Sequence, residues 1–264
     1  MEAFTHREAK NMMKTQILRA AAGALLAAEL LAFGSAACAA PIDDGVAYLK
    51  AGKYPEAMKV FKAEAAKDVP DAFFYIGDMV NQGLGQKSIP LQATDWWEKG
   101  AYLGSEKCQL ALSMAYRNGV GVRVEPRQAL LWDREAARAG SIVAMKNIGD
   151  YFATGNGVEI DAKEAAKWYY RAAKGGYPEG LRALGDLLKS GEGAPKNLQA
   201  AYVLIQAAAK PVEEKGWEAD RNAAADARIL GHSLTADELA AAEKTSVADV
   251  LKSLSALDPE PGRM

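Results

Sequence analysis

The chain has 264 residues, half of them apolar and a quarter charged, with 32 lysines and arginines against 34 aspartates and glutamates. This balance leaves no basic surplus, so we expect no nucleic-acid partner. Only two histidines and two cysteines are present, and one of each lies in the first 40 residues. The rest of the chain therefore holds too few ligands for a structural zinc site and a single thiol, so we expect no metal, no cofactor and no internal disulfide.

Residues 1–40 have the pattern of a secretory signal peptide. Four basic residues precede or enter an apolar stretch from Ile17 to Phe33, and small residues follow it. Such segments direct export and are removed, so we expect a periplasmic or secreted protein. The alternatives are an uncleaved membrane anchor, a first solenoid helix, and a lipoprotein signal with lipid on Cys38. The sequence leaves the start open among Met1, Met12 and Met13.

The body of the chain repeats with a period of 36 residues. Glycine recurs at this spacing in two columns, tryptophan in a third, and alanine in others. The columns are Gly83, Gly119, Gly155 and Gly191; Gly85, Gly121, Gly157 and Gly193; and Trp96, Trp132 and Trp168. A fixed period of this length is typical of a solenoid, in which each repeat buries its apolar face against its neighbours.

Each repeat has the pattern of two short helices. In one repeat, apolar spacings of three and four predict a first helix over 143–153, which the glycines of 155–157 end because glycine adopts left-handed conformations. The second helix is predicted to begin at Asp161, with Glu164 completing a capping box. We expect the tryptophan column to fill the space between helix layers. The sequence therefore predicts an all-α solenoid of antiparallel helix pairs.

The repeat resembles the Sel-one-like repeat (SLR) family, a relative of the tetratricopeptide repeat. The likeness rests on Ala-x-x-x-Ile-Gly-x-Tyr-x-x-x-Gly-x-Gly at 144–157, and on Asp161, Ala165, Trp168 and Gly176 beyond it. It implies a right-handed superhelix. The four SLR repeats are expected at 70–105, 106–141, 142–177 and 178–210.

The flanks of these repeats also have a predicted organisation. Residues 41–69 resemble a degenerate, tetratricopeptide-like first repeat. Residues 211–256 are predicted to form a C-terminal cap of two helices, Trp217–Leu230 and Leu234–Ala256, because a terminal repeat needs its apolar face covered. We expect a disordered tail over 257–264.

The motifs that suggest chemistry have structural interpretations. Each Gly-x-Gly lacks the third glycine and the preceding strand of a phosphate-binding loop, so we interpret it as a turn. Gly231-His232-Ser233 resembles part of a hydrolase elbow, but Ser233 or Thr235 is more simply the N-cap of the final helix. We therefore predict no catalytic residue and a protein that is not an enzyme. A cell-wall or β-lactam-processing hydrolase, as suggested for distant family members, is the alternative.

Two columns of the first helices form a candidate stripe for partner binding. Its residues are Tyr75, Asp78, Met114, Asn147, Asp150 and Asp186. The resemblance implies that these helices line a concave groove, where a row of carboxylates suits the lysine and arginine side chains of an extended peptide. A solvated helix face is the structural alternative.

The sequence thus predicts a protein–protein interaction scaffold or adaptor in the bacterial cell envelope. It would contact a membrane only through the N-terminal signal, an anchor or a lipid on Cys38. A small-molecule or glycan binder that uses Tyr75 and Tyr177 is a further alternative. The identity of the partner and the oligomeric state stay open.

Overall fold

The structure is a computed structural model that describes residues 42–259. The predicted signal at 1–40, Cys38 and the candidate starts lie outside the described residues, as do 260–264. Over the described range the chain forms thirteen α-helices, two short 3-10 helices and one isolated β-bridge, with no strand. No helix within 42–259 is long and apolar enough to cross a membrane.

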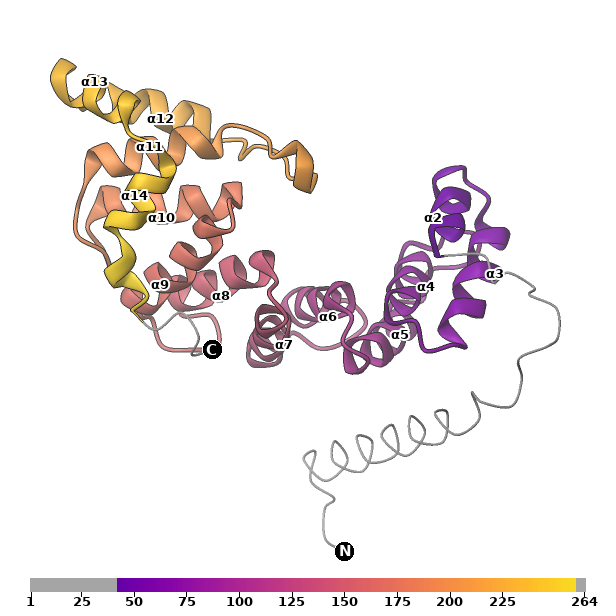
Figure 1. The fold of residues 1–264 in the computed structure, drawn as a ribbon. Coiled ribbons are helices and arrows are strands. Elements are labelled where there is room, and N and C mark those ends of the chain that lie inside the picture. Colours follow the sequence, from indigo (N-terminus) through magenta and orange to yellow (C-terminus); the bar gives the residue numbers. More distant parts are fainter. Residues whose placement is uncertain (1–41, 260–264) are drawn as a thin grey trace, which may run out of the picture. The chain divides into compact units, whose positions relative to one another are not determined.

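Ten of the helices form five consecutive pairs, which confirms the predicted all-α solenoid of helix pairs (Figure 1). We call the first helix of each pair the A helix and the second the B helix. The A helices are α2 (Ile42–Lys50), α4 (Pro70–Gln82), α6 (Glu106–Asn118), α8 (Ile142–Thr154) and α10 (Pro178–Ser190). The B helices are α3 (Tyr54–Ala65), α5 (Pro90–Tyr102), α7 (Pro126–Arg138), α9 (Ala162–Lys174) and α11 (Leu198–Ala208). Each B helix except α11 also packs on the A helix of the next pair.

Small residues at period 36 let these helices approach closely. One alanine column is fully buried in all five pairs: Ala57, Ala93, Ala129, Ala165 and Ala201. A glycine column on the A helices faces a large side chain on the B helix of the same pair. These facing residues are Gly77 with Trp97, Gly149 with Tyr169, and Gly185 with Ile205. A Cβ at any of the three glycines would overlap the facing side chain.

Two of the three column tryptophans do not fill the space between the helices, contrary to the prediction. Trp168 is buried, but Trp96 and Trp132 are only half-buried. The space between the helices is filled by the next residue along each B helix, such as Trp97, which is 1% exposed. Adjacent residues on a helix point about 100° apart, so a one-residue offset moves a side chain from the core to its edge.

The loop glycines join each repeat to the one before it. The first glycine of each loop ends an A helix with φ between 72° and 84°, as predicted, and the second has φ between 71° and 79°. The second glycine lies against the start of the B helix of the preceding repeat. These contacts join Gly85 to Tyr54, Gly121 to Pro90, Gly157 to Pro126, and Gly193 to Ala162.

Only one of the two side-chain contacts of the predicted capping box at Asp161 is present. The Asp161 carboxylate accepts hydrogen bonds from the backbone amides of Lys163 and Glu164, both at 3.0 Å. The Glu164 carboxylate does not complete the box, because it accepts a hydrogen bond from Trp168 Nε1 at 2.8 Å. Thr235 and Glu238 do form a full capping box at the start of a later helix.

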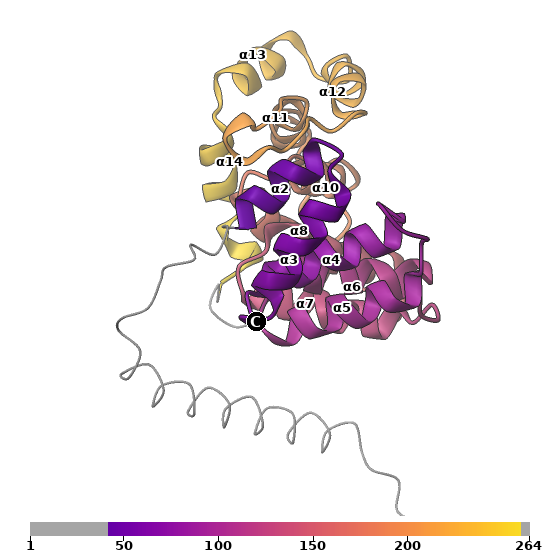
Figure 2. The same ribbon diagram turned by 90° about the vertical axis from the view of Figure 1, so that its right-hand side faces the viewer.

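The C-terminal cap differs from the predicted helix pair. It contains three short helices, α12 (Ala223–Gly231), α13 (Ala236–Lys244) and α14 (Val247–Ser253), which pack beside α11 (Figures 1 and 2). The second predicted helix is broken because Thr245 is extended and the Ser246 side chain accepts a hydrogen bond from the Asp249 amide, which starts α14. Trp217 lies outside any helix and forms the isolated bridge with Val212.

The beginning of the predicted tail is ordered. A 3-10 helix over Ser255–Leu257 packs against α9, and Asp258 is 5% exposed. Its carboxylate binds Arg171 through two hydrogen bonds, at 2.8 and 2.9 Å. The expectation of disorder from 257 onward is therefore wrong for Leu257 and Asp258.

Candidate partner-binding surface

The predicted stripe residues lie on four successive A helices. Tyr75 and Asp78 are on α4, Met114 on α6, Asn147 and Asp150 on α8, and Asp186 on α10. Met114 is 42% exposed, and the other five are half-buried. Their side chains nevertheless have different partners, so the stripe is not a uniform row of free carboxylates.

Tyr75 joins neighbouring repeats. Its ring stacks on Phe61 with centroids 4.8 Å apart, and Lys107 donates a hydrogen bond to its hydroxyl at 3.2 Å. Lys107 also pairs with Asp71 at 2.8 Å, and this contact together with Ser105 holds the pKa of Asp71 below its usual value despite partial burial. Tyr75 thus packs within the solenoid and leaves little ring surface for a glycan or peptide.

Asn147 points toward a buried acid that the sequence analysis missed. Its Nδ2 donates to Asp133 at 3.1 Å, and Ser113 donates to the same carboxylate at 2.5 Å. Asp133 and Ser113 are fully buried. In the other repeats, the position equivalent to Ser113 is a glycine and the position equivalent to Asp133 is the large side chain that faces it. Burial raises the pKa of Asp133 to about 6, although Ser113, Asn147 and Arg117 favour its charged form.

This pKa makes Asp133 a pH-dependent element of stability. Because the folded pKa lies above the unfolded value, the folded chain holds the proton more tightly, so stability is greatest below about pH 4 and falls as pH rises to about 6. Replacing Asp133 with asparagine removes this loss. We expect the variant to gain about 2–3 kcal/mol relative to the wild type between pH 4 and pH 7.

Urea unfolding at several pH values measures that difference. Asp95→Asn, at an exposed position of α5, is the matched control and is expected to give a flat difference. A flat difference for Asp133→Asn as well would show that the carboxyl is not held in a desolvated site.

Asp150 and Asp78 are already engaged. Asp150 accepts hydrogen bonds from Lys146 and from the Tyr169 hydroxyl, both at 2.9 Å, and burial together with Asp150 raises the pKa of Tyr169. Gln82 donates to Asp78 at 2.8 Å. Lys146 also pairs with Glu179 on α10 at 3.0 Å, so it links two repeats across this face.

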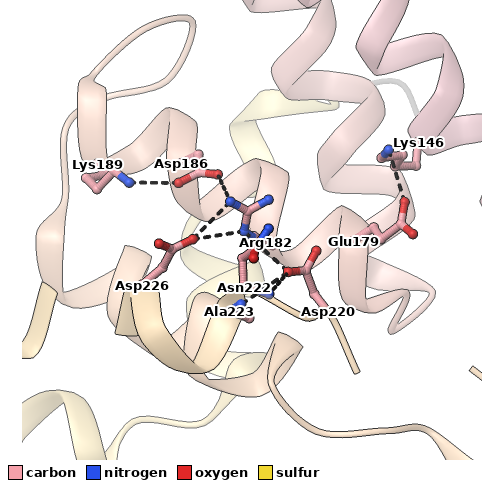
Figure 3. Close-up of polar contacts among 9 residues, drawn as sticks. All are labelled: Lys146, Glu179, Arg182, Asp186, Lys189, Asp220, Asn222, Ala223 and Asp226. Atoms are coloured by element: carbon pink, nitrogen blue, oxygen red, sulfur yellow. Dashed lines mark hydrogen bonds and ion pairs between the residues drawn. The ribbon is translucent and has the colours of Figure 1, made fainter. Parts of the chain in front are cut away.

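Arg182 on α10 is the centre of the densest charge cluster on the A helices (Figure 3). It donates two hydrogen bonds to Asp226, at 2.9 and 3.1 Å, and lies 3.5 Å from Asp220 and 3.9 Å from Asp186. Burial opposes its charge, but these carboxylates keep its pKa above the usual value. Asp220 also accepts hydrogen bonds from the backbone amides of Asn222 and Ala223, where α12 begins. The cluster fastens the cap to the last repeat.

Carboxylates outnumber cations on this part of the surface. The acids are Glu179, Asp186, Asp220 and Asp226, and the bases are Lys146, Arg182 and Lys189 (Figure 3). Asp150, which pairs with Lys146, is a fifth acid. Beside them is a pocket of about 270 Å³ whose wall includes Tyr177 and Trp217. Their rings meet edge to face with centroids 5.2 Å apart.

The rim of this pocket is mainly acidic. Glu179, Glu218 and Asp220 line it together with one cation, Arg221. Glu218 forms no salt bridge with any residue of 42–259. The pocket could not be predicted from the sequence because Trp217 was expected to lie within a helix, although Tyr177 was a candidate for binding a small molecule or glycan.

Other reactive groups of the described chain lie apart from this surface. Cys108 is buried, and burial raises the pKa of its thiol to about 12. His232 is exposed at the end of α12. Within residues 42–259 no three histidine, cysteine or acidic side chains are grouped to hold a metal ion. The chemistry that the surface offers is ion pairing, hydrogen bonding and aromatic contact.

Solved structures resemble this arrangement of helices. The crystal structure of a Sel1 repeat protein from Oxalobacter formigenes superposes with a TM-score of 0.62 at 26% identity, over 84% of this chain and 85% of that chain. The structure of c5321, a protective antigen of uropathogenic Escherichia coli strains with an SLR fold, gives a TM-score of 0.60 at 22% identity. It covers 84% of this chain and 53% of that chain, and its likeness shows the fold. A search of curated proteins gave no match.

The family assignment rests on the repeats themselves. The model of the Sel1 repeat matches residues 70–105, 107–141, 142–177 and 178–210, more than half of the chain. Sel1 repeat proteins are generally non-catalytic scaffolds for protein–protein interaction. The chain belongs to the Sel1 repeat family.

Proposed function

We propose that this protein is a scaffold of the bacterial cell envelope that binds a basic segment of a partner protein. The binding surface would be the A-helix face of α8 and α10 together with the loop before α12. The proposed location rests on the signal-like pattern of residues 1–40. The proposed binding mode rests on the surface just described.

The observation that carries the proposal is the acid-rimmed aromatic pocket at Tyr177 and Trp217. The face of an aromatic ring attracts ammonium and guanidinium groups, and the Lys215 Nζ lies 4.7 Å from the Trp217 ring centroid. The partner's cation would take the place of this exposed lysine on the ring. Glu179 and Glu218 add carboxylates at the rim. A lysine or arginine side chain therefore finds both ring surface and a counter-ion in this pocket.

Charge-altering variants test the proposal without disturbing the Arg182 cluster. We would make Glu179→Gln with Glu218→Lys, because both side chains are exposed and neither is bound by Arg182. The matched control, Glu56→Gln with Glu243→Lys, makes the same change in charge at exposed positions of α3 and α13.

The experiment is a cross-linked pull-down from an envelope extract with the full chain as bait. We expect a protein that the wild type and the control recover and that the pocket variant loses. Equal recovery by all three baits would move the binding site away from the pocket. Recovery of no specific protein would contradict the scaffold role and favour assays of cell-wall and β-lactam hydrolysis.

A further inference from the structure

The C-terminal segment shows what binds to the outer face of a B helix. On α9 the Arg171 guanidinium stacks on the Trp168 ring, with its central carbon 4.8 Å from the ring centroid. Asp258 binds Arg171 through both carboxylate oxygens. The side chains of Arg171 and Asp258 are only 6% and 1% exposed. On α9, a cation that stacks on a tryptophan therefore binds an acidic side chain from the C-terminal segment.

The same pair recurs on α5, 72 residues earlier. Helices α5 and α9 each have 13 residues and begin at equivalent positions of their repeats. Trp96 and Lys99 stand where α9 has Trp168 and Arg171, and the Lys99 ammonium also lies 4.8 Å from its ring. On the helix between them, Glu135 replaces the cation, so the pair is not a general feature of the repeats.

The pair on α5 has no acidic partner among residues 42–259. Lys99 is exposed and forms no salt bridge with any of them. Trp96 is half-buried where Trp168 is buried. The helices that pack extensively on α5 are α4 and α6, whereas α9 also contacts the C-terminal segment.

We propose that Trp96 and Lys99 form a docking site for an aspartate- or glutamate-bearing segment of a partner protein. The segment would bind with its carboxylate on the Lys99 ammonium, as Asp258 binds Arg171 on α9. This site lies on a B helix and takes an acidic segment, so it is independent of the basic segment proposed for the A-helix face.

The differences between the two sites predict weaker binding on α5. Lysine makes a single point contact where arginine holds both oxygens of a carboxylate. Asp95 also stands where α9 has Lys167, and it places a like charge near the incoming acid. A reversible contact suits a partner, whereas the buried pair on α9 suits a permanent cap.

A labelled peptide tests the site on the full chain. The probe is a fluorescein-labelled, amidated peptide of residues 252–259, which contains Asp258, and the measurement is fluorescence anisotropy. We expect Lys99→Arg to bind the peptide roughly three- to tenfold more tightly than the wild type, because it allows two parallel hydrogen bonds. Lys99→Glu, and a peptide with asparagine for Asp258, are expected to lose binding.

Controls separate this site from others. Lys62→Glu makes the same change in charge at an exposed position of α3 and is expected to bind like the wild type. Binding that persists in Lys99→Glu would mean that the peptide displaces the chain's own segment from α9, and would overturn the proposal. Lys99→Arg that binds no more tightly than the wild type would overturn it too.

Discussion

Replacing Gly121 with alanine is expected to lower the free energy of unfolding by about 3–4 kcal/mol. Part of this loss is the left-handed backbone, with φ of 71°, where a Cβ costs about 1–2 kcal/mol. The larger part is a clash, because the new Cβ would overlap the carbonyl of Pro90 in the first turn of α5. That carbonyl belongs to a helix that packs on two others, so it cannot move without disturbing both.

Gly140 supplies the matched control. It also has a left-handed backbone, with φ of 96°, but nothing lies within 4 Å of the position where its Cβ would be. Gly140→Ala is therefore expected to lose only the backbone share, about 1–2 kcal/mol. Urea unfolding of both variants gives the comparison. Equal losses would show that the loop does not pack against the preceding repeat.

The 36-residue period was enough to predict the helix pairs and their glycine turns. Glycine has a distinct backbone requirement, so its columns mark turns without any knowledge of neighbours. The same period did not reveal which aromatic column fills the space between helices, because Trp96 and Trp97 are adjacent and the sequence does not show their facing partners. A column of small residues marks the facing positions, because each member faces the residue 20 positions later. Its members are Gly77, Ser113, Gly149 and Gly185.

The candidate surface was less predictable than the fold. The pairing of Lys146 with Asp150 follows the i, i+4 rule and is readable from sequence. The contacts of Arg182 with Asp220 and Asp226 are not, because they depend on how the cap folds back onto the last repeat. The pocket at Tyr177 and Trp217 arises from the same return of the chain, which no local pattern specifies.

The contact between Arg171 and Asp258 spans 87 residues, and its removal is expected to have a comparably large effect. Asp258→Ala removes the carboxylate that binds the Arg171 guanidinium in a nearly dry site. Breaking a buried pair in this way costs about 3–5 kcal/mol if the C-terminal segment stays in place. If the segment detaches, the loss is smaller, because water then solvates Arg171.

Two measurements distinguish these results. Urea unfolding gives the total loss, and hydrogen exchange of the α14 amides reports whether the segment has detached. Asp237→Ala, at an exposed position of α13, is the control and is expected to stay within about 0.5 kcal/mol of the wild type. A neutral Asp258→Ala with unchanged exchange in α14 would contradict the role of this ion pair.

A double variant then tests why the ion pair is there. Replacing Arg171 and Asp258 together with leucine removes both charges of this ion pair, so we expect most of the stability lost in Asp258→Ala to return. Stability alone would then not require an ion pair at this position. The two hydrogen bonds between Arg171 and Asp258 are directional, so they fix where the C-terminal segment lies on α9. Two leucines have no such directional contact and would hold the segment in a less defined register. Faster hydrogen exchange in α14 of the double variant, at unchanged global stability, is the expected sign of that loss.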